Sequence, residues 1–375
     1  MKKTIFMALV LLAGLLPSMA CDTPVFRYAL EKWEPESYPA FVFLEDSLTA
    51  EEAAAMAPLN QLSGNLTVER VNIAKLAAGF DAAPYEFKGL KKKYRKSKEQ
   101  LNAEQKRAAA ERAFRYKRSM VERFGQGKPL PYAVVCFPSE IENGLSKAGD
   151  VLWEGVPDAQ VFAALAESPT RTEIANRILD GDSAVWLMLP SGEAEKDEAC
   201  LARLNEMLRT AERTVELSIP GKDDTISGGV PLRLSFSTLR VDPSVPEEAF
   251  FIQTLRKLRE KRGALGGKHL SCCPAPSASV SPQGCDAKFP VVIPIIGRGR
   301  AIEWVTGEQI NEEYIIELCR YISGPCSCEI KNQNPGMDML FSVDWESRFV
   351  PMMGPDEGPG ELKGLGGMLK KDDDV

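Results

Sequence analysis

Cysteine is the residue type in this chain with the clearest capacity for chemistry. Six of its nine cysteines lie between residues 272 and 328. Cys326 and Cys328 are separated by one residue, so a disulfide between them would be small and strained, and strained disulfides are the more easily reduced ones. The helical pattern before them ends at Gly324, which would place both thiols near the negative end of a helix and raise their pKa values. These two residues are the redox candidates, and their position argues against a catalytic pair.

The other four cysteines of this group have two possible roles. As thiolates they would suit Zn²⁺ or Cu⁺, with His269 as a further ligand. Their spacing lacks paired C-x-x-C knuckles, however, and thiolate ligands are open to oxidation in an oxidising compartment. We therefore expect structural disulfides instead, because pairing is the default in an exported chain. The four residues are Cys272, Cys273, Cys285 and Cys319.

Other kinds of site find little support in the sequence. The chain has a single histidine, so sites built from several histidines are nearly excluded. We find no P-loop, nucleophile-elbow, zincin or EF-hand spacing, and no cofactor is implied. A net charge of -7 from 46 basic and 53 acidic residues argues against nucleic acid as a partner.

The first 20 residues have the organisation of a signal peptide. Lys2 and Lys3 precede an uncharged, mainly apolar stretch of 12 residues from Ile5 to Leu16. That stretch is too short to cross a bilayer of about 30 Å. We therefore expect export to the periplasm.

Cys21 follows the signal peptide directly, and the sequence S-M-A-C resembles the lipobox of bacterial lipoproteins. Ser18 stands where the lipobox usually has leucine, so cleavage by ordinary signal peptidase is the alternative. Lipidation of Cys21 would leave eight cysteines, an even number that can pair completely. We favour a lipid anchor at Cys21, which would attach the protein to a membrane surface.

The two halves of the mature chain are expected to have the same order of strands and helices. A linking helix is expected between them, within residues 168–182. In the first half, strands are expected at 38–44, 66–73, 132–137 and 151–155, with helices at 49–62, about 85–124 and 158–167. In the second half, strands are expected at 183–189, 231–241, 291–296 and 301–305, with helices at 193–214, 247–261 and 310–322.

Pro131 stands just before the third strand of the first half, and Pro290 stands just before the third strand of the second. This order of elements resembles the thioredoxin fold, in which a cis-proline precedes the third strand. The resemblance covers most of the mature chain at the level of topology. It implies an α/β fold of two tandem thioredoxin-like domains, each a mixed sheet flanked by helices, with Pro131 and Pro290 as structural cis-proline candidates.

The chain departs from that family at the reactive turn. Redox-active thioredoxins carry C-x-x-C between the first strand and the first helix, where the helix N-terminus lowers a thiol pKa. Residues 45–52 have no cysteine, and residues 190–200 have only Cys200, about two helical turns too late. Neither domain is therefore expected to perform the family's chemistry. The opening of the mature chain, CDTPVFRYALEKW, also resembles the start of mature chains in a family of exported bacterial proteins, which implies no activity.

Two basic segments are candidates for surface interactions. Residues 88–118 contain 13 Lys and Arg against 3 Glu and have no wide apolar stripe. A solvated helix is the usual meaning of such a run, and docking on anionic lipid or on a protein partner is the alternative. Residues 297–300, Gly-Arg-Gly-Arg, are expected to form a hairpin turn, with an anion cradle as the alternative.

Taken together, these features predict an exported, lipid-anchored periplasmic protein that binds or scaffolds an envelope protein at a membrane surface and is not an enzyme. Thiol–disulfide or metal handling by the C-terminal cysteines is the alternative. The expected organisation is a signal peptide at 1–20, a first domain at 21–167, a linking helix at 168–182, a second domain at 183–350 with a Cys-rich loop at 262–290, and a disordered tail at 351–375.

Overall fold

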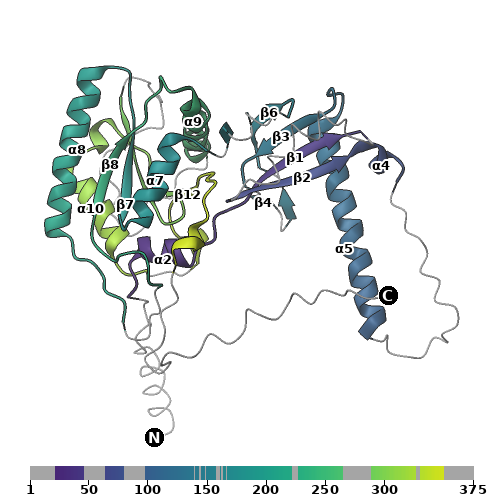
Figure 1. Cartoon of the computed structure of the whole chain (residues 1–375), viewed down its shortest axis with the longest axis horizontal. Coiled ribbons are helices and arrows are strands. Elements are labelled where there is room, and N and C mark those ends of the chain that lie inside the picture. The colour runs from purple at the N-terminus through teal and green to yellow at the C-terminus, as the bar shows by residue number, and fades with distance from the viewer. Residues whose placement is uncertain are drawn as a thin grey trace, which may run out of the picture.

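The protein contains two mixed β-sheets, each flanked by helices, which gives the α/β class expected from the sequence (Figure 1). The signal peptide, Cys21, most of the Cys-rich loop and the C-terminal tail lie outside the described residues. A computed structural model describes residues 22–45, 64–79, 98–138, 140–142, 145–147, 149–157, 161, 164–165, 167–221, 227–264, 289–326 and 330–349.

The first sheet has four strands, in the order β2 (Leu66–Asn72), β1 (Tyr38–Leu44), β3 (Tyr132–Cys136) and β6 (Val151–Gly155). Strand β1 is parallel to β2 and antiparallel to β3, and β6 is antiparallel to β3. A small hairpin of β4 (Glu140–Glu142) and β5 (Leu145–Lys147) separates β3 from β6.

Strand β1 is buried on both faces, which explains why its sequence is a continuous apolar run. Phe41 and Phe43 pack on one face against the end of a long helix, and Ala40 and Val42 face the opposite way because side chains alternate along a strand. The helical elements on the Phe41 side are α4 (Ile73–Ala77), α5 (Lys98–Met120) and the π-helical turn η2 (Val121–Gly125).

The second sheet repeats the arrangement of the first. Its order is β8 (Phe236–Arg240), β7 (Ala184–Leu189), β9 (Val291–Ile296), β10 (Arg300–Ala301) and β12 (Met337–Asp338), and β11 (Val305–Thr306) also pairs with β9. Strand β7 is parallel to β8 and antiparallel to β9, as β1 is to β2 and β3. The strand expected at 301–305 is therefore divided between β10 and β11.

Helices cover both faces of the second sheet. Trp186 and Met188 of β7 face one layer, and Val185 and Leu187 face the other. The first layer contains α2 (Val25–Glu31), α8 (Ala194–Thr214) and α10 (Glu312–Ser323), and the second contains α7 (Pro169–Leu179) and α9 (Ala249–Ala264). Single 3-10 turns are η3 (Pro246–Glu248), η4 (Gly307–Gln309), η5 (Lys331–Gln333) and η6 (Trp345–Arg348).

The N-terminal helix α2 belongs to the second domain, whereas the sequence placed residues 21–167 in the first. Val25 and Phe26 are buried in the core beside α10. The Val25 N–H donates to the Gly324 carbonyl at 3.0 Å, and the Cys326 N–H donates to the Thr23 carbonyl at 2.9 Å. A seven-residue helix carries too little pattern to show which sheet it covers, so the first boundary was wrong at its N-terminal end.

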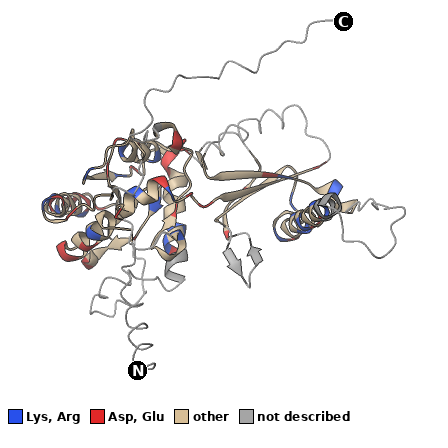
Figure 2. Cartoon of the chain, turned by 90° about the horizontal axis from the view of Figure 1, so that it is seen from below, with Lys and Arg blue, Asp and Glu red and all other residues tan. Residues whose placement is uncertain are grey.

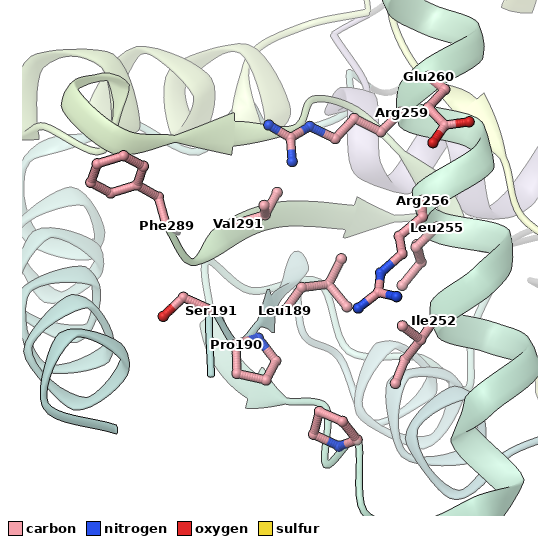
Figure 3. A pocket seen from close by; sticks show the side chains of 11 residues that line it. Leu189, Pro190, Ser191, Ile252, Leu255, Arg256, Arg259, Glu260, Phe289 and Val291 are labelled. Atoms are coloured by element: carbon pink, nitrogen blue, oxygen red, sulfur yellow. The ribbon is translucent and has the colours of Figure 1, made fainter. Parts of the chain in front are cut away.

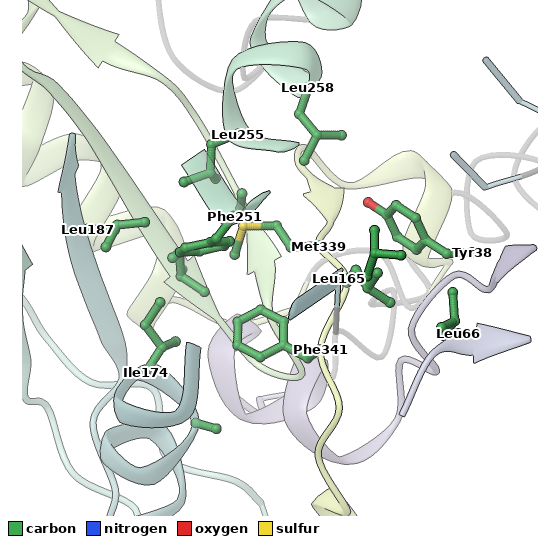
Figure 4. Packing of buried hydrophobic residues seen from close by; sticks show 14 of the residues in the cluster. Tyr38, Leu66, Leu165, Ile174, Leu187, Phe251, Leu255, Leu258, Met339 and Phe341 are labelled. Carbon is green, nitrogen blue, oxygen red and sulfur yellow. The ribbon is translucent and has the colours of Figure 1, made fainter. Parts of the chain in front are cut away.

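A C-terminal segment joins the two sheets (Figure 4). Met339 and Phe341 are buried in a single hydrophobic cluster that includes Tyr38 and Leu66 of the first sheet and Leu187 of the second. The Tyr38 hydroxyl donates to the Asp338 carbonyl at 2.7 Å. The two domains therefore share a continuous core and are not separated by a free linker.

Candidate ligand-binding site

The turn between β7 and α8 is the position at which the family resemblance would place redox thiols. It is held by Asp197, whose side chain is 0% exposed. The Asp197 carboxylate accepts hydrogen bonds from the Ser191 N–H at 2.8 Å, the Ser191 hydroxyl at 2.8 Å and the Gly192 N–H at 3.3 Å. Arg240 lies 3.6 Å from the same carboxylate. The donors of this turn are thus already bound by an internal anion.

A pocket of about 350 Å³ opens beside this turn (Figure 3). It lies where the end of β7, the start of β9 and one side of α9 meet. Ser191 is at one edge, and Phe289, which is 49% exposed, is at another. The apolar lining includes Leu189, Ile252, Leu255 and Val291.

Two arginines of α9 line the same pocket. Arg256 is exposed and Arg259 is half-buried. They are three residues apart on the helix, so their side chains lie on one face. Neither makes an ion pair or a hydrogen bond with any residue that the structure describes. Glu260 also lines the pocket, so the described lining residues carry two guanidiniums and one carboxylate.

The rim carries one further cation. The Lys196 ammonium lies 5.9 Å from the centre of the Phe289 ring, within range of a weak cation–π interaction. Lys196 also donates to Glu193 at 2.7 Å, and this exposed acid offsets its charge. Arg256 and Arg259 are therefore the cations of the site that lack a described counter-charge.

Of the two redox candidates, only Cys326 is among the described residues. Cys326 is 1% exposed, and Cys328 lies outside the described residues. Cys319, a weak metal candidate, is a free thiol that is 0% exposed, and burial raises its pKa strongly. Because the thiolate is the reactive form, Cys319 is protected from both oxidation and metal binding in this fold.

Of the remaining cysteines, the structure describes only Cys136 and Cys200. Cys272, Cys273 and Cys285 lie outside the described residues, as does Cys21. Burial raises the pKa of the free Cys136 thiol to about 11 and also raises that of Cys200 on α8. Among the described residues, no group of three or more His, Cys, Asp or Glu side chains is placed to hold a metal ion.

The two candidate cis-prolines differ. The Leu130–Pro131 peptide bond, just before β3, is cis. The Phe289–Pro290 bond, at the matching place before β9, is not among the cis bonds of the described chain, which corrects the expectation for Pro290.

The turn of the first domain that corresponds to the Ser191 turn falls largely within residues 46–63, outside the described residues. Only the second domain therefore offers a site that is described at this turn.

The Gly-Arg-Gly-Arg segment forms the hairpin turn between β9 and β10, with Gly297 at φ 56° and Gly299 at φ 86°. Its arginines serve the fold and not a ligand. Arg298 donates to the Leu30 carbonyl at 2.7 Å, and Arg300 donates to Asp338 at 2.8 Å. Both guanidiniums are nearly fully buried.

The basic helix is described only from residue 98 onward. Helix α5 runs away from the first sheet (Figure 1), and Figure 2, which shows it nearly end-on, marks Lys and Arg positions in blue on its ribbon. Its last turns are fixed by Tyr116, whose ring lies 6.0 Å from that of Phe41, and by a 3.2 Å ion pair from Lys117 to Glu69 on β2. Most of its described side chains are exposed, as in a solvated helix.

Comparison with protein-family models, with curated proteins and with solved structures gives no significant match for this chain. Among the described helices, none is both long and apolar enough to cross a membrane. The geometry of the pocket is therefore the basis of the proposed function.

Sequence reasoning singled out the Ser191 turn and the Phe289–Pro290 segment, but not Arg256 or Arg259. The sequence shows that the two arginines share one face of a helix. It does not show that they line a pocket with the Ser191 turn, because that depends on how α9 packs across the sheet.

Proposed function

We propose that this chain is an exported binding protein of two thioredoxin-like domains, which binds its ligand in the pocket of the second domain. The repeated strand order supports the fold assignment. In both sheets the first two strands are parallel and the third is antiparallel to the first, which is the arrangement that the resemblance implies.

The observation that carries the proposal is the position of the pocket. It opens between Ser191 and Phe289, at the turn where a redox-active relative would hold its thiols. Here Asp197 occupies the turn's donors, and the nearest cysteine on α8, Cys200, has a raised pKa. A recess with no activated thiol among its described lining residues is suited to binding and not to thiol exchange.

Attachment to the envelope is part of the same proposal. Lipidation at Cys21 would hold the mature chain on a membrane surface. The basic helix α5 would add attraction to anionic head groups. Replacement Cys21→Ser should release the protein from membrane pellets into the soluble fraction, and a variant that stays in the pellet would contradict the lipid anchor.

The alternative is a thiol–disulfide or metal-handling role for the C-terminal cysteines. Burial of Cys319 and Cys326 disfavours that role for these two residues, because a reactive thiol must be accessible and partly ionised. A direct test of binding also separates the two functions.

We suggest site-specific photocrosslinking in the native envelope. A benzophenone amino acid at Phe289, on the pocket rim, should yield an adduct that intact-mass measurement detects on the full-length protein. The same probe at Ile219, which is 74% exposed and does not line the pocket, serves as the matched control and should yield none.

The thiol dependence of the adduct distinguishes the two functions. The adduct at position 289 should persist when Cys326 and Cys328 are both replaced by serine. Loss of the adduct in that double variant would favour the thiol role. Equal adducts at positions 219 and 289 would show that the pocket is not selective, and would overturn the proposal.

A further inference from the structure

The pocket combines an apolar interior with two cations that have no described partner. Leu189, Ile252, Leu255 and Val291 provide an apolar surface, and Phe289 adds an exposed aromatic ring at the rim. A volume of about 350 Å³ is at the small end of the range for pockets that hold organic ligands.

Arg256 and Arg259 differ from the buried arginines of the described chain in having no partner among the described residues. Other arginines near the core satisfy their guanidiniums internally. Arg171 donates to the carbonyls of Leu165 and Leu340 at 2.6 and 3.1 Å, and Arg27 donates to the Val230 carbonyl at 2.9 Å. These buried arginines are structural donors, and the pair on α9 does not share that role.

The negative end of a ligand would lie on the α9 side of the pocket. At the opposite edge, Asp197 already accepts from Ser191 and Gly192, so the start of α8 offers an anion little. Glu260 is the only acid among the described lining residues, which gives them a net positive charge beside the apolar surface. Guanidinium groups bind carboxylate and phosphate through paired hydrogen bonds.

We propose that this pocket takes an organic anion, with its carboxylate or phosphate head on Arg256 and Arg259 and its apolar body against Leu189, Leu255 and Val291. The assignment rests on the proposed function and adds the class of ligand to it. Inorganic phosphate lacks the apolar body and binds weakly. A neutral or cationic amphiphile with the same apolar chain as the anion lacks the head group that the arginines recognise.

Isothermal titration of the full mature chain tests the assignment with five probes: decanoate, decyl phosphate, decanol, decyltrimethylammonium and inorganic phosphate. Decanoate or decyl phosphate should bind more tightly than the other three, and a difference between these two identifies the preferred head group. Their affinity should fall with added salt, because the arginines are partly exposed.

The double variant R256Q/R259Q should bind the preferred anion about tenfold more weakly than the native chain. The matched control is R209Q/R213Q, which removes the same charge from exposed positions on α8 and should bind as the native chain does. Equal thermal unfolding midpoints for the two double variants would show that both are folded.

Three results would overturn the assignment: equal affinity for decanol and decanoate, unchanged anion affinity in R256Q/R259Q, or no binding by any probe. The photocrosslink at Phe289 separates this failure from that of the proposed function. If the adduct forms but the anions do not bind selectively, the pocket binds a ligand of another class. If no adduct forms, the proposed function itself fails.

Discussion

The hydroxyl and the backbone N–H of Ser191 both donate to one oxygen of the buried Asp197 carboxylate, each at 2.8 Å. This contact fixes the turn at one edge of the pocket. It also supplies an internal negative charge at the start of α8, where a helix attracts anions. The carboxylate therefore shapes the site and keeps that edge unsuited to an anionic group.

Replacement of Asp197 by alanine should destabilise the protein by about 2–4 kcal/mol, because it leaves the buried donors of Ser191 and Gly192 without their acceptor. Urea unfolding gives the free energy of unfolding. The control is Glu195→Gln, on the exposed side of the same helical turn, which should change stability by less than about 0.5 kcal/mol. Equal effects of the two replacements would contradict the role given to Asp197.

Asn65 connects the two domains through its side chain. It donates to the Met339 carbonyl at 3.0 Å and accepts from the Phe341 N–H at 2.9 Å. Replacement by alanine should cost about 2–4 kcal/mol, because both backbone groups are then left buried and unpaired. We also expect loosened domain contact, measured as faster amide hydrogen exchange at Phe341.

Asn72 provides the comparison for that experiment. Its side chain accepts from the Lys75 N–H at 2.7 Å on the protein surface, and Asn72→Asp keeps this capping bond. This variant should unfold at the native denaturant concentration, with native exchange at Phe341. If Asn65→Ala behaves in the same way, the C-terminal segment is held by its hydrophobic contacts alone.

Alkaline pH should destabilise the folded chain partly through Cys136. Burial raises the pKa of this thiol from 9.0 to about 11, so the unfolded thiol ionises at a lower pH than the folded one. The stabilisation is therefore complete below pH 9 and is lost as the pH rises towards about 11. Tyr38, whose pKa is also raised by burial, acts in the same direction.

Replacement of Cys136 by alanine removes this titration and should make stability depend less steeply on pH in that window. Urea unfolding midpoints between about pH 8 and pH 11 provide the measurement. The native chain should also leave Cys136 unmodified by a thiol reagent at neutral pH until it is unfolded. An unchanged slope in Cys136→Ala would show that this thiol titrates alike in both states.

The order of the elements could be predicted because it depends on local patterns. The run Tyr38–Leu44 is apolar at nearly every position, and β1 has those bounds. Strands β6 and β9 also follow the sequence pattern, since alternation and helical periodicity are properties of neighbouring residues. The division of residues 301–305 into two strands was missed because it depends on pairing with β9 and β12.

The sequence by itself determined the α/β class and the absence of cysteine pairs at the two turns, and it predicts an export signal at residues 1–20, since each is contained in a short stretch of chain. The tertiary structure decided that α2 packs beside α10 and that Asn65 meets Phe341. It also brought Arg256 and Ser191 to the lining of one pocket. These contacts join residues far apart in the chain, and their energy comes from packing and hydrogen bonds that no local pattern encodes.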